Sequence, residues 1–180
     1  FGDAERHILS FFNVGATFTY ADVGYTVTKS GKPTCSKGEP KTDIYIAAED
    51  IHHNIAEFKV SFKKKNADFL ENKTNAERAE QLFGSDWENI ISNATTALQD
   101  EFLSRMLIYK EKLGKTDKGA ITLGWKFELL NVKSGQLSGN MQLTQDQIID
   151  VYAGTNLKGD KRDATVNGEQ IPFSGVANYI

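Results

Sequence analysis

The stretch that decides the fold is PKTDIYIAAEDIHHNIAEFKVSFKKK, residues 40–65. It contains two short apolar runs, 42–48 and 55–62, in which apolar and polar residues alternate as they do in half-buried β-strands. The polar segment 49–54 separates the two runs and has the length of a hairpin loop. The stretch therefore predicts two strands joined as a β-hairpin.

Charged residues occur in both runs where the pattern predicts the core. Asp43 begins the first run, and Glu57 and Lys59 lie inside the second. Since successive strand side chains point to opposite faces, Glu57 and Lys59 share one face of the second strand. Asp43 and Tyr45 share one face of the first, so pairing as a hairpin is expected to bring Asp43 beside the Glu57–Lys59 face. The opposite face of the second strand is apolar and is predicted to be core: it carries Ala56, Phe58, Val60 and Phe62.

Two carboxylates and an ammonium in this arrangement have a chemical use. Carboxylate oxygens, water and phosphate are the ligands that Mg²⁺ prefers, so Asp43 and Glu57 are candidate metal ligands. A bound metal polarises a phosphoryl oxygen and lowers the pKa of a water molecule. Lys59 points the same way as Glu57 and is expected to assist the attacking water or offset charge in the transition state. The pattern predicts metal-dependent phosphodiester hydrolysis.

The same residues resemble a known family. PKTD at 40–43, thirteen further residues, and EFK at 57–59 are similar to the motif of PD-(D/E)XK nucleases, and the lysines that follow resemble some type II restriction endonucleases. The resemblance implies an α+β fold of α/β/α type, with a central mixed β-sheet flanked by helices and a restriction-endonuclease-like core. It also implies Mg²⁺ dependence, with Mn²⁺ as an expected substitute, and cleavage of double-stranded DNA. One departure is that Pro40 precedes Asp43 by three residues instead of adjoining it.

A basic segment follows the triplet. Lys63, Lys64 and Lys65 are expected to contact the phosphate backbone together with Ser61. The alternative for each lysine is a solvated strand end.

Short triplets of this kind also occur by chance. Glu39-Pro-Lys41 and Glu71-Asn-Lys73 match the same pattern, but the first has a central proline and the second is expected in a polar stretch between helices. The alternative for Glu57 and Lys59 is an exposed salt-bridge face on an antiparallel sheet. The alternatives for function are a repair or recombination nuclease of the same fold, or a non-catalytic DNA- or protein-binding domain.

Three other charged groups invite a functional interpretation. His52-His53 falls in the predicted hairpin loop, where a surface role is favoured over metal binding. Glu5 lies on the predicted first helix, where some members of the family have an additional metal-binding acid, although a solvated residue is favoured. Lys158-Gly-Asp-Lys161-Arg162 is a polar loop that either enters a DNA groove or simply connects two elements.

The rest of the chain gives an α+β outline within one expected domain, residues 1–180, possibly excised from a longer chain because it begins at Phe1. Capping boxes at Thr74–Glu77 and Ser85–Glu88 predict helix starts, and the second helix is expected to continue to Leu113. The other expected elements are helices at 3–12 and 144–152, strands at 121–132 and 140–143, an alternating stretch at 25–28, and a hairpin through Asn167-Gly168.

Composition limits the remaining possibilities. The net charge of −3 gives no overall basic signal, so DNA contact has to come from a local patch. Cys35 is the only cysteine, which excludes an internal disulfide and fits a reducing, cytoplasmic location. With no apolar run near 20 residues, the chain is expected to be soluble, without membrane contact. No spare apolar surface is evident, so we expect a monomer or a weak dimer in the absence of DNA.

Overall fold

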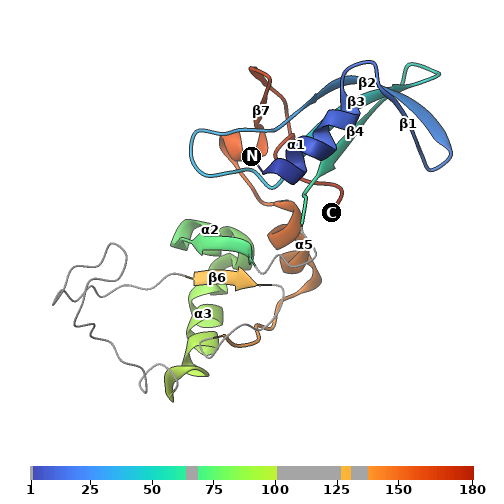
Figure 1. The fold of residues 1–180 in the computed structure, drawn as a ribbon. Helices are drawn as coiled ribbons and strands as arrows, with labels where there is room; N and C mark the ends of the chain where they lie inside the picture. Colours follow the sequence, from blue (N-terminus) through green and yellow to red (C-terminus); the bar gives the residue numbers. More distant parts are fainter. Residues whose placement is uncertain (1, 64–68, 101–126, 131–137) are drawn as a thin grey trace, which may run out of the picture. The chain divides into compact units, whose positions relative to one another are not determined.

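The computed structural model describes residues 2–63, 69–100, 127–130 and 138–180. The chain divides into two units, one made of Phe1–Asn66 and Gln145–Ile180 and the other of Ala67–Thr144 (Figure 1). Each unit is described by itself below, and the single nuclease domain expected over 1–180 stays a prediction.

A four-stranded antiparallel sheet forms the centre of the first unit. Its strands lie side by side in chain order, as a meander, so each neighbouring pair is joined by a direct connection. The strands are β1 (Thr17–Tyr20), β2 (Val23–Gly31), β3 (Ile44–Asp50) and β4 (Ile55–Val60).

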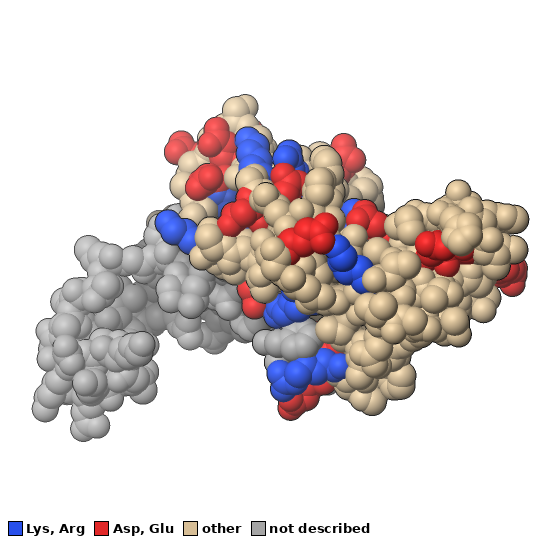
Figure 2. All heavy atoms as spheres, turned by 90° about the horizontal axis from the view of Figure 1, so that it is seen from above, with Lys and Arg blue, Asp and Glu red and all other residues tan. Residues whose placement is uncertain are grey.

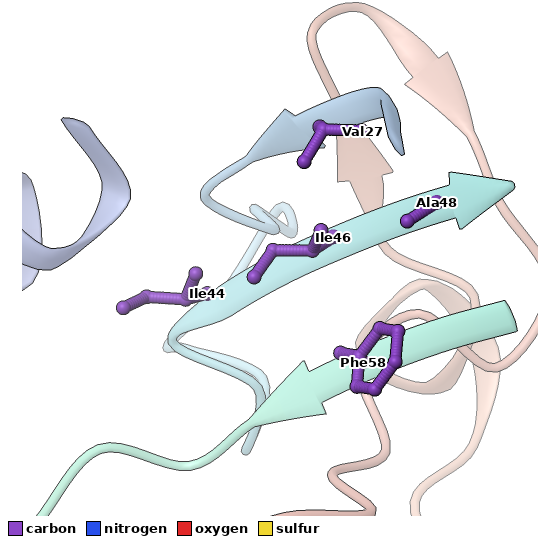
Figure 3. Close-up of a cluster of buried hydrophobic side chains, with 5 residues drawn as sticks. All are labelled: Val27, Ile44, Ile46, Ala48 and Phe58. Carbon is purple, nitrogen blue, oxygen red and sulfur yellow. The ribbon is translucent and has the colours of Figure 1, made fainter. Parts of the chain in front are cut away.

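One face of this sheet carries the main hydrophobic core, shown in Figure 3. Helix α1 (Asp3–Leu9) and the short 3-10 helix η1 (Ser10–Phe12) contribute Ile8, Leu9 and Phe12 to this face. The sheet and helix side chains pack together because both elements are amphipathic, with their apolar sides turned to each other. The buried residues of the cluster are Val27, Ile44, Ile46, Ala48 and Phe58.

The opposite face has a smaller core. Tyr45 and Ala47 of β3 are buried there with Val166 and Ile171. Val166 belongs to a short hairpin formed by β7 (Thr165–Val166) and β8 (Glu169–Gln170). The hairpin turns at Asn167-Gly168, where both residues have positive φ, 51° and 86°, as a two-residue turn of this kind requires.

The segment that follows this hairpin closes the edge of β4. Val60 pairs with Tyr179 in a parallel bridge, and the Ser61 amide donates to the Tyr179 carbonyl at 2.8 Å. Two helices, α5 (Gln145–Ala153) and α6 (Gly159–Arg162), precede the hairpin. The outer edge of β4 is thus capped by one isolated bridge from a distant part of the chain.

The second unit pairs β5 (Phe69–Thr74) with β6 (Phe127–Leu130) in antiparallel fashion. Helix α2 (Ala76–Phe83), 3-10 helix η2 (Gly84–Asp86) and helix α3 (Trp87–Thr96) follow β5. Its buried apolar residues are Ala79, Leu82, Phe83, Ile91 and Leu129.

Most of the expected elements are present, and the α+β class is confirmed. The first helix, the 42–62 hairpin, the helix beginning near 144 and the hairpin at Asn167-Gly168 all lie where the sequence places them. Of the strand expected at 121–132, Phe127–Leu130 is seen as β6, and the remaining positions lie outside the described residues. Among the described residues, no helix is long and apolar enough to cross a membrane.

Four expectations about the second unit are wrong. Glu71-Asn-Lys73 lies in strand β5, not in a polar link, because a strand paired on one side tolerates polar residues. Helix α2 begins one residue later than expected: Asn75, not Thr74, caps it by accepting a bond from the Arg78 amide at 2.8 Å. Helix α3 ends at Thr96 with a turn at 97–98, so it does not run unbroken towards 113. Residues 140–143 form no strand.

Candidate active site at the ends of strands β3 and β4

The faces of the β3–β4 hairpin agree with the alternation in the sequence. Tyr45 lies opposite Lys59 and Ala47 opposite Glu57, so these four side chains share one face. Phe58, between the two charged residues, turns into the core on the other face. Glu57 and Lys59 therefore lie on one face of the sheet, as expected.

Glu57, Lys59 and Tyr45 form a closed polar cluster. The Tyr45 hydroxyl donates to Oε1 of Glu57, and Nζ of Lys59 lies 3.7 Å from Oε2. Burial of Tyr45, followed by its hydrogen bond to Glu57, raises the pKa of the phenol well above its usual range. Both carboxylate oxygens of Glu57 thus already have partners within the sheet.

The C-terminal segment covers the same cluster. The Lys59 ammonium also donates to the carbonyl of Phe173 at 3.3 Å, and its side chain is only 13% exposed. The Asn178 side chain holds the backbone on either side of Phe58: its Oδ1 accepts from the Lys59 amide at 2.7 Å, and its Nδ2 donates to the Glu57 carbonyl at 2.9 Å. These contacts hold Glu57 and Lys59 in place at the edge of β4.

Asp43 has different neighbours. Its Oδ2 accepts a hydrogen bond from the Phe62 amide at 2.7 Å and lies 3.7 Å from Nζ of Lys63. Both side chains are partly covered, with 17% of Asp43 and 26% of Lys63 exposed. The structure therefore brings Asp43 together with Lys63, which was expected to contact DNA, instead of with Lys59.

The hairpin register explains this pairing. Ile44 lies opposite Val60 and Ala47 opposite Glu57, so Asp43 is displaced by four residues from the level of Glu57. At the usual rise along a strand, four residues correspond to about 13 Å. The Asp43 amide also donates to the Val60 carbonyl at 2.8 Å, so Asp43 and Ile44 both face Val60 in the manner of a bulge. The expected convergence of Asp43 and Glu57 is not seen in this arrangement.

A second carboxylate near Asp43 comes from helix α1. Burial raises the pKa of the Asp43 carboxyl; Lys63 and the Phe62 amide act against that rise, Glu5 adds to it, and Lys32 lowers it. Glu5 itself is held by Lys32, whose Nζ lies 3.6 Å from Oε2 of Glu5. Glu5 thus belongs to the electrostatic environment of Asp43, whereas a purely solvated position was favoured from the sequence.

The carboxylates at Asp43 are of the donor type that a hard divalent cation prefers. Mg²⁺ takes one or two protein carboxylates and completes its coordination with water and substrate phosphate. Asp43 and Glu5 supply that donor type, and the raised pKa of Asp43 reflects a largely buried carboxylate that a cation would stabilise. Within the described parts of the chain, no group of three or more His, Cys, Asp or Glu residues is placed to hold a metal.

Sequence reasoning assigned Ser61 and Lys63 to DNA contact and missed that Lys63 of the triplet Ser61-Phe62-Lys63 pairs with Asp43. Its lysine has the same spacing as Lys59 in Glu57-Phe58-Lys59, but it lies at the Asp43 end of the hairpin. Ser61 is fully buried, and its hydroxyl has no hydrogen-bond partner; the same is true of the Thr42 hydroxyl. The position of the expected loop could have indicated this pairing. A hairpin folded about the centre of residues 49–54 brings position 43 opposite position 60, near Lys63 and away from Glu57.

The other candidates occupy simpler positions. His53 lies in the hairpin loop, where its Nδ1 contacts Oε1 of Glu49, and the two histidines do not converge on a metal. The polar loop expected at 158–162 is wrong, because Gly159–Arg162 forms the short helix α6 after Lys158. Arg162 binds Asp163 and lies over the ring of Phe173. Lys64 and Lys65 lie outside the described residues.

In comparisons with protein-family models, curated proteins and solved structures, nothing matched this chain.

Proposed function

We propose that this protein is a Mg²⁺-dependent endonuclease of double-stranded DNA, of the type II restriction kind, with its active site centred on Asp43. The observation that carries the proposal is the Asp43–Lys63 pair. A largely buried carboxylate and an ammonium lie 3.7 Å apart at the end of an antiparallel hairpin, and Glu5 acts on the same carboxylate. Perturbed carboxylates with a specific charged partner are typical of functional sites.

In this proposal each residue has a stated role. Asp43 holds the metal, with Glu5 as the second carboxylate of the site. Bound Mg²⁺ supplies Lewis-acid activation of the phosphoryl group and of a water molecule. Lys63 orients the scissile phosphate and offsets the negative charge that develops on it, since its ammonium already lies beside the Asp43 carboxylate.

The arrangement expected from the sequence is the alternative site for the same reaction. There Asp43 and Glu57 hold the metal, and Lys59 assists the water. This alternative site requires the carboxylates of Asp43 and Glu57 to approach each other from positions four residues apart along the hairpin. It also requires Glu57 to give up its contacts with Tyr45 and Lys59. The contacts of the hairpin favour the Asp43–Lys63 site over this one.

DNA contact in this proposal is local. Lys63, with Lys64 and Lys65 beyond the described segment, would bind the backbone beside the metal. The contact expected from Ser61 is left out of the proposal, because that side chain is fully buried. On the face seen in Figure 2, Lys and Arg side chains are interspersed with Asp and Glu side chains, without a broad basic area. Binding therefore depends on a few phosphate contacts close to the site, in line with the net charge of −3.

The proposal includes a more specific fold assignment, a restriction-endonuclease-like core. A restriction-endonuclease-like core has a mixed sheet, and the parallel Val60–Tyr179 bridge beside the antiparallel hairpin supports that arrangement. A repair or recombination nuclease on this core remains the alternative among enzymes.

One observation favours a second function. Glu57 and Lys59 are fully engaged with Tyr45 and the C-terminal segment, as they would be in a DNA- or protein-binding domain without catalysis. Metal uptake separates the two functions, because a binding domain needs no cation at Asp43.

The test is cleavage of supercoiled plasmid in the presence of millimolar Mg²⁺ or Mn²⁺, compared with cleavage in EDTA. We expect metal-dependent cleavage that is lost in Asp43→Asn and Lys63→Met and retained in Lys29→Met, whose side chain binds Glu169. Cleavage that persists in Asp43→Asn contradicts the site. DNA binding without cleavage or metal uptake in the wild type favours the non-catalytic function.

A further inference from the structure

Lys32 lies at the same end of the sheet as Asp43. Strand β2 ends at Gly31, which pairs with Tyr45 of β3, so Lys32 is one residue further along, level with Ile44. Ile44 packs in the core face that α1 covers, and α1 also carries Glu5. The sheet register and the helix thus bring Lys32 between Glu5 and the start of β3.

The ammonium of Lys32 is shared between two carboxylates. Its Nζ lies 3.6 Å from Oε2 of Glu5 and 3.5 Å from Oε1 of Glu39. Lys32 and Glu5 are about equally covered, with 20% and 21% of their side chains exposed, whereas Glu39 is 72% exposed. The Lys32–Glu5 contact is therefore the less hydrated of the two and the less screened by solvent.

The electrostatic influence of this pair reaches Asp43. Glu5 and Lys32 act on the Asp43 carboxyl in opposite directions, and Lys63 contacts it from the β4 side. The group as a whole has three carboxylates, Glu5, Glu39 and Asp43, and two ammonium groups. Much of the negative charge that would attract a divalent cation is thus already offset by lysines of the chain itself.

We propose that Lys32 is a built-in counter-ion of the Asp43–Glu5 site, which a divalent cation must displace from Glu5 when it binds. The inference rests on the proposed function, because it assigns Asp43 and Glu5 to the metal. It adds that the affinity for metal is limited by this chain's own lysine. Cation binding and the Lys32–Glu5 contact then compete, since both draw on the negative charge of the Glu5 carboxylate.

The experiment measures Mn²⁺ binding to the full 180-residue chain, without DNA, by the loss of the free-Mn²⁺ electron paramagnetic resonance signal. Lys32→Met should bind Mn²⁺ about tenfold more tightly than the wild type, because it removes a positive charge within a few ångströms of the cation. Lys32→Arg retains the charge and should bind within about twofold of the wild type. Lys29→Met is the matched control: it removes a lysine of β2 three positions before Lys32, one that is paired with Glu169, and should leave the affinity unchanged.

The outcomes separate this inference from the function on which it rests. Asp43→Asn identifies the site. If the wild type and Asp43→Asn take up the same amount of Mn²⁺, the proposed metal site and the role of Lys32 both fail. If Asp43-dependent uptake is present and Lys32→Met binds no more tightly, Lys32 is not a competing counter-ion, while the metal site stands. Lys32→Gln, which keeps a polar side chain, replaces Lys32→Met if circular dichroism shows that the methionine variant is unfolded, and the same result is expected of it.

Discussion

The Lys63 ammonium lies 3.7 Å from Oδ2 of Asp43, and the Phe62 amide donates to the same oxygen at 2.7 Å. One carboxylate oxygen thus joins the start of β3 to the residues just past the end of β4. The relationship links a candidate metal ligand to a candidate phosphate-binding lysine, and it makes the Asp43 end of the hairpin the place to test.

Asp43→Ala should lower DNA cleavage by at least about 1000-fold, because a metal ion supplies several kcal/mol of transition-state stabilisation. DNA binding should be retained or become tighter, since a negative charge near phosphate is removed. Cleavage is measured on plasmid in Mg²⁺, and binding by fluorescence anisotropy in Ca²⁺. Wild-type cleavage by Asp43→Ala would show that the metal is held elsewhere.

The raised pKa of Asp43 predicts a pH-dependent stability difference. Because burial raises this pKa in the folded state, the folded protein binds the proton more tightly than the unfolded chain does. Stability associated with this group is present below its ordinary pKa of 3.8 and is lost as pH rises through the raised value. Asp43→Asn should therefore melt at a higher temperature than the wild type at pH 7, and the two should converge below pH 3.8. Added Mg²⁺ should stabilise only the wild type; equal stabilisation of both proteins would argue against a cation at Asp43.

Glu57→Gln distinguishes the two candidate sites. We expect this variant to retain cleavage, because Glu57 is engaged with Tyr45 and Lys59 instead of with Asp43. It should lose about 1 kcal/mol of unfolding free energy in urea, the usual net contribution of one such hydrogen bond. Tyr45→Phe should lose a similar amount, and the double variant should lose less than the sum of the two, because both changes break the same contact. A folded Glu57→Gln protein without cleavage would restore Glu57 as a metal ligand.

Lys63→Ala should weaken DNA binding for all sequences alike and lower the salt dependence of binding by about one unit of the log–log slope, as expected for one lost phosphate contact. Anisotropy titrations over a range of NaCl concentrations measure both quantities. Lys29→Ala, on the same sheet but paired with Glu169, serves as the control. A sequence-dependent loss would mean that Lys63 reads bases.

Self-association gives a further prediction. One Asp43–Lys63 site attacks one phosphodiester at a time, and we expect the free protein to be a monomer or a weak dimer. Light scattering should give a mass near 20.0 kDa. Under single-turnover conditions, supercoiled plasmid should pass through a nicked form before it becomes linear. A tight dimer that produces linear DNA directly would contradict this prediction and leave the site assignment unchanged.

Local patterns in the sequence were enough to predict the individual elements of the first unit. Alternation in 42–62 gave both strands and the shared face of Glu57 and Lys59, and Asn167-Gly168 gave the turn of the last hairpin. These features depend on a few neighbouring residues. The surroundings of Asp43 do not: Glu5 and Lys32 act on it from other parts of the chain, and Val60 beside it pairs with the distant Tyr179.

Strand β5 shows the same limit in another form. FLENKT at 69–74 alternates poorly and carries four consecutive polar residues, so its own composition favours a loop. Its pairing partner, β6, comes more than fifty positions later in the chain. A strand specified mainly by a distant partner is not visible from its own residues.

The bridge between β4 and the C-terminal segment has a consequence for synthesis of the chain. Lys59 and Asn178, which it brings together, are 119 positions apart. At ribosomal rates of about 5–20 residues per second, β4 emerges about 6–24 s before its partner. During that interval its outer edge presents free amide and carbonyl groups, which are a template for pairing with strands of other nascent chains. Pairing with the residues around Asn178 thus covers this edge late in synthesis and is expected to limit aggregation. Variants that weaken this pairing should reduce the yield of soluble protein more than they reduce the stability of molecules that have already folded.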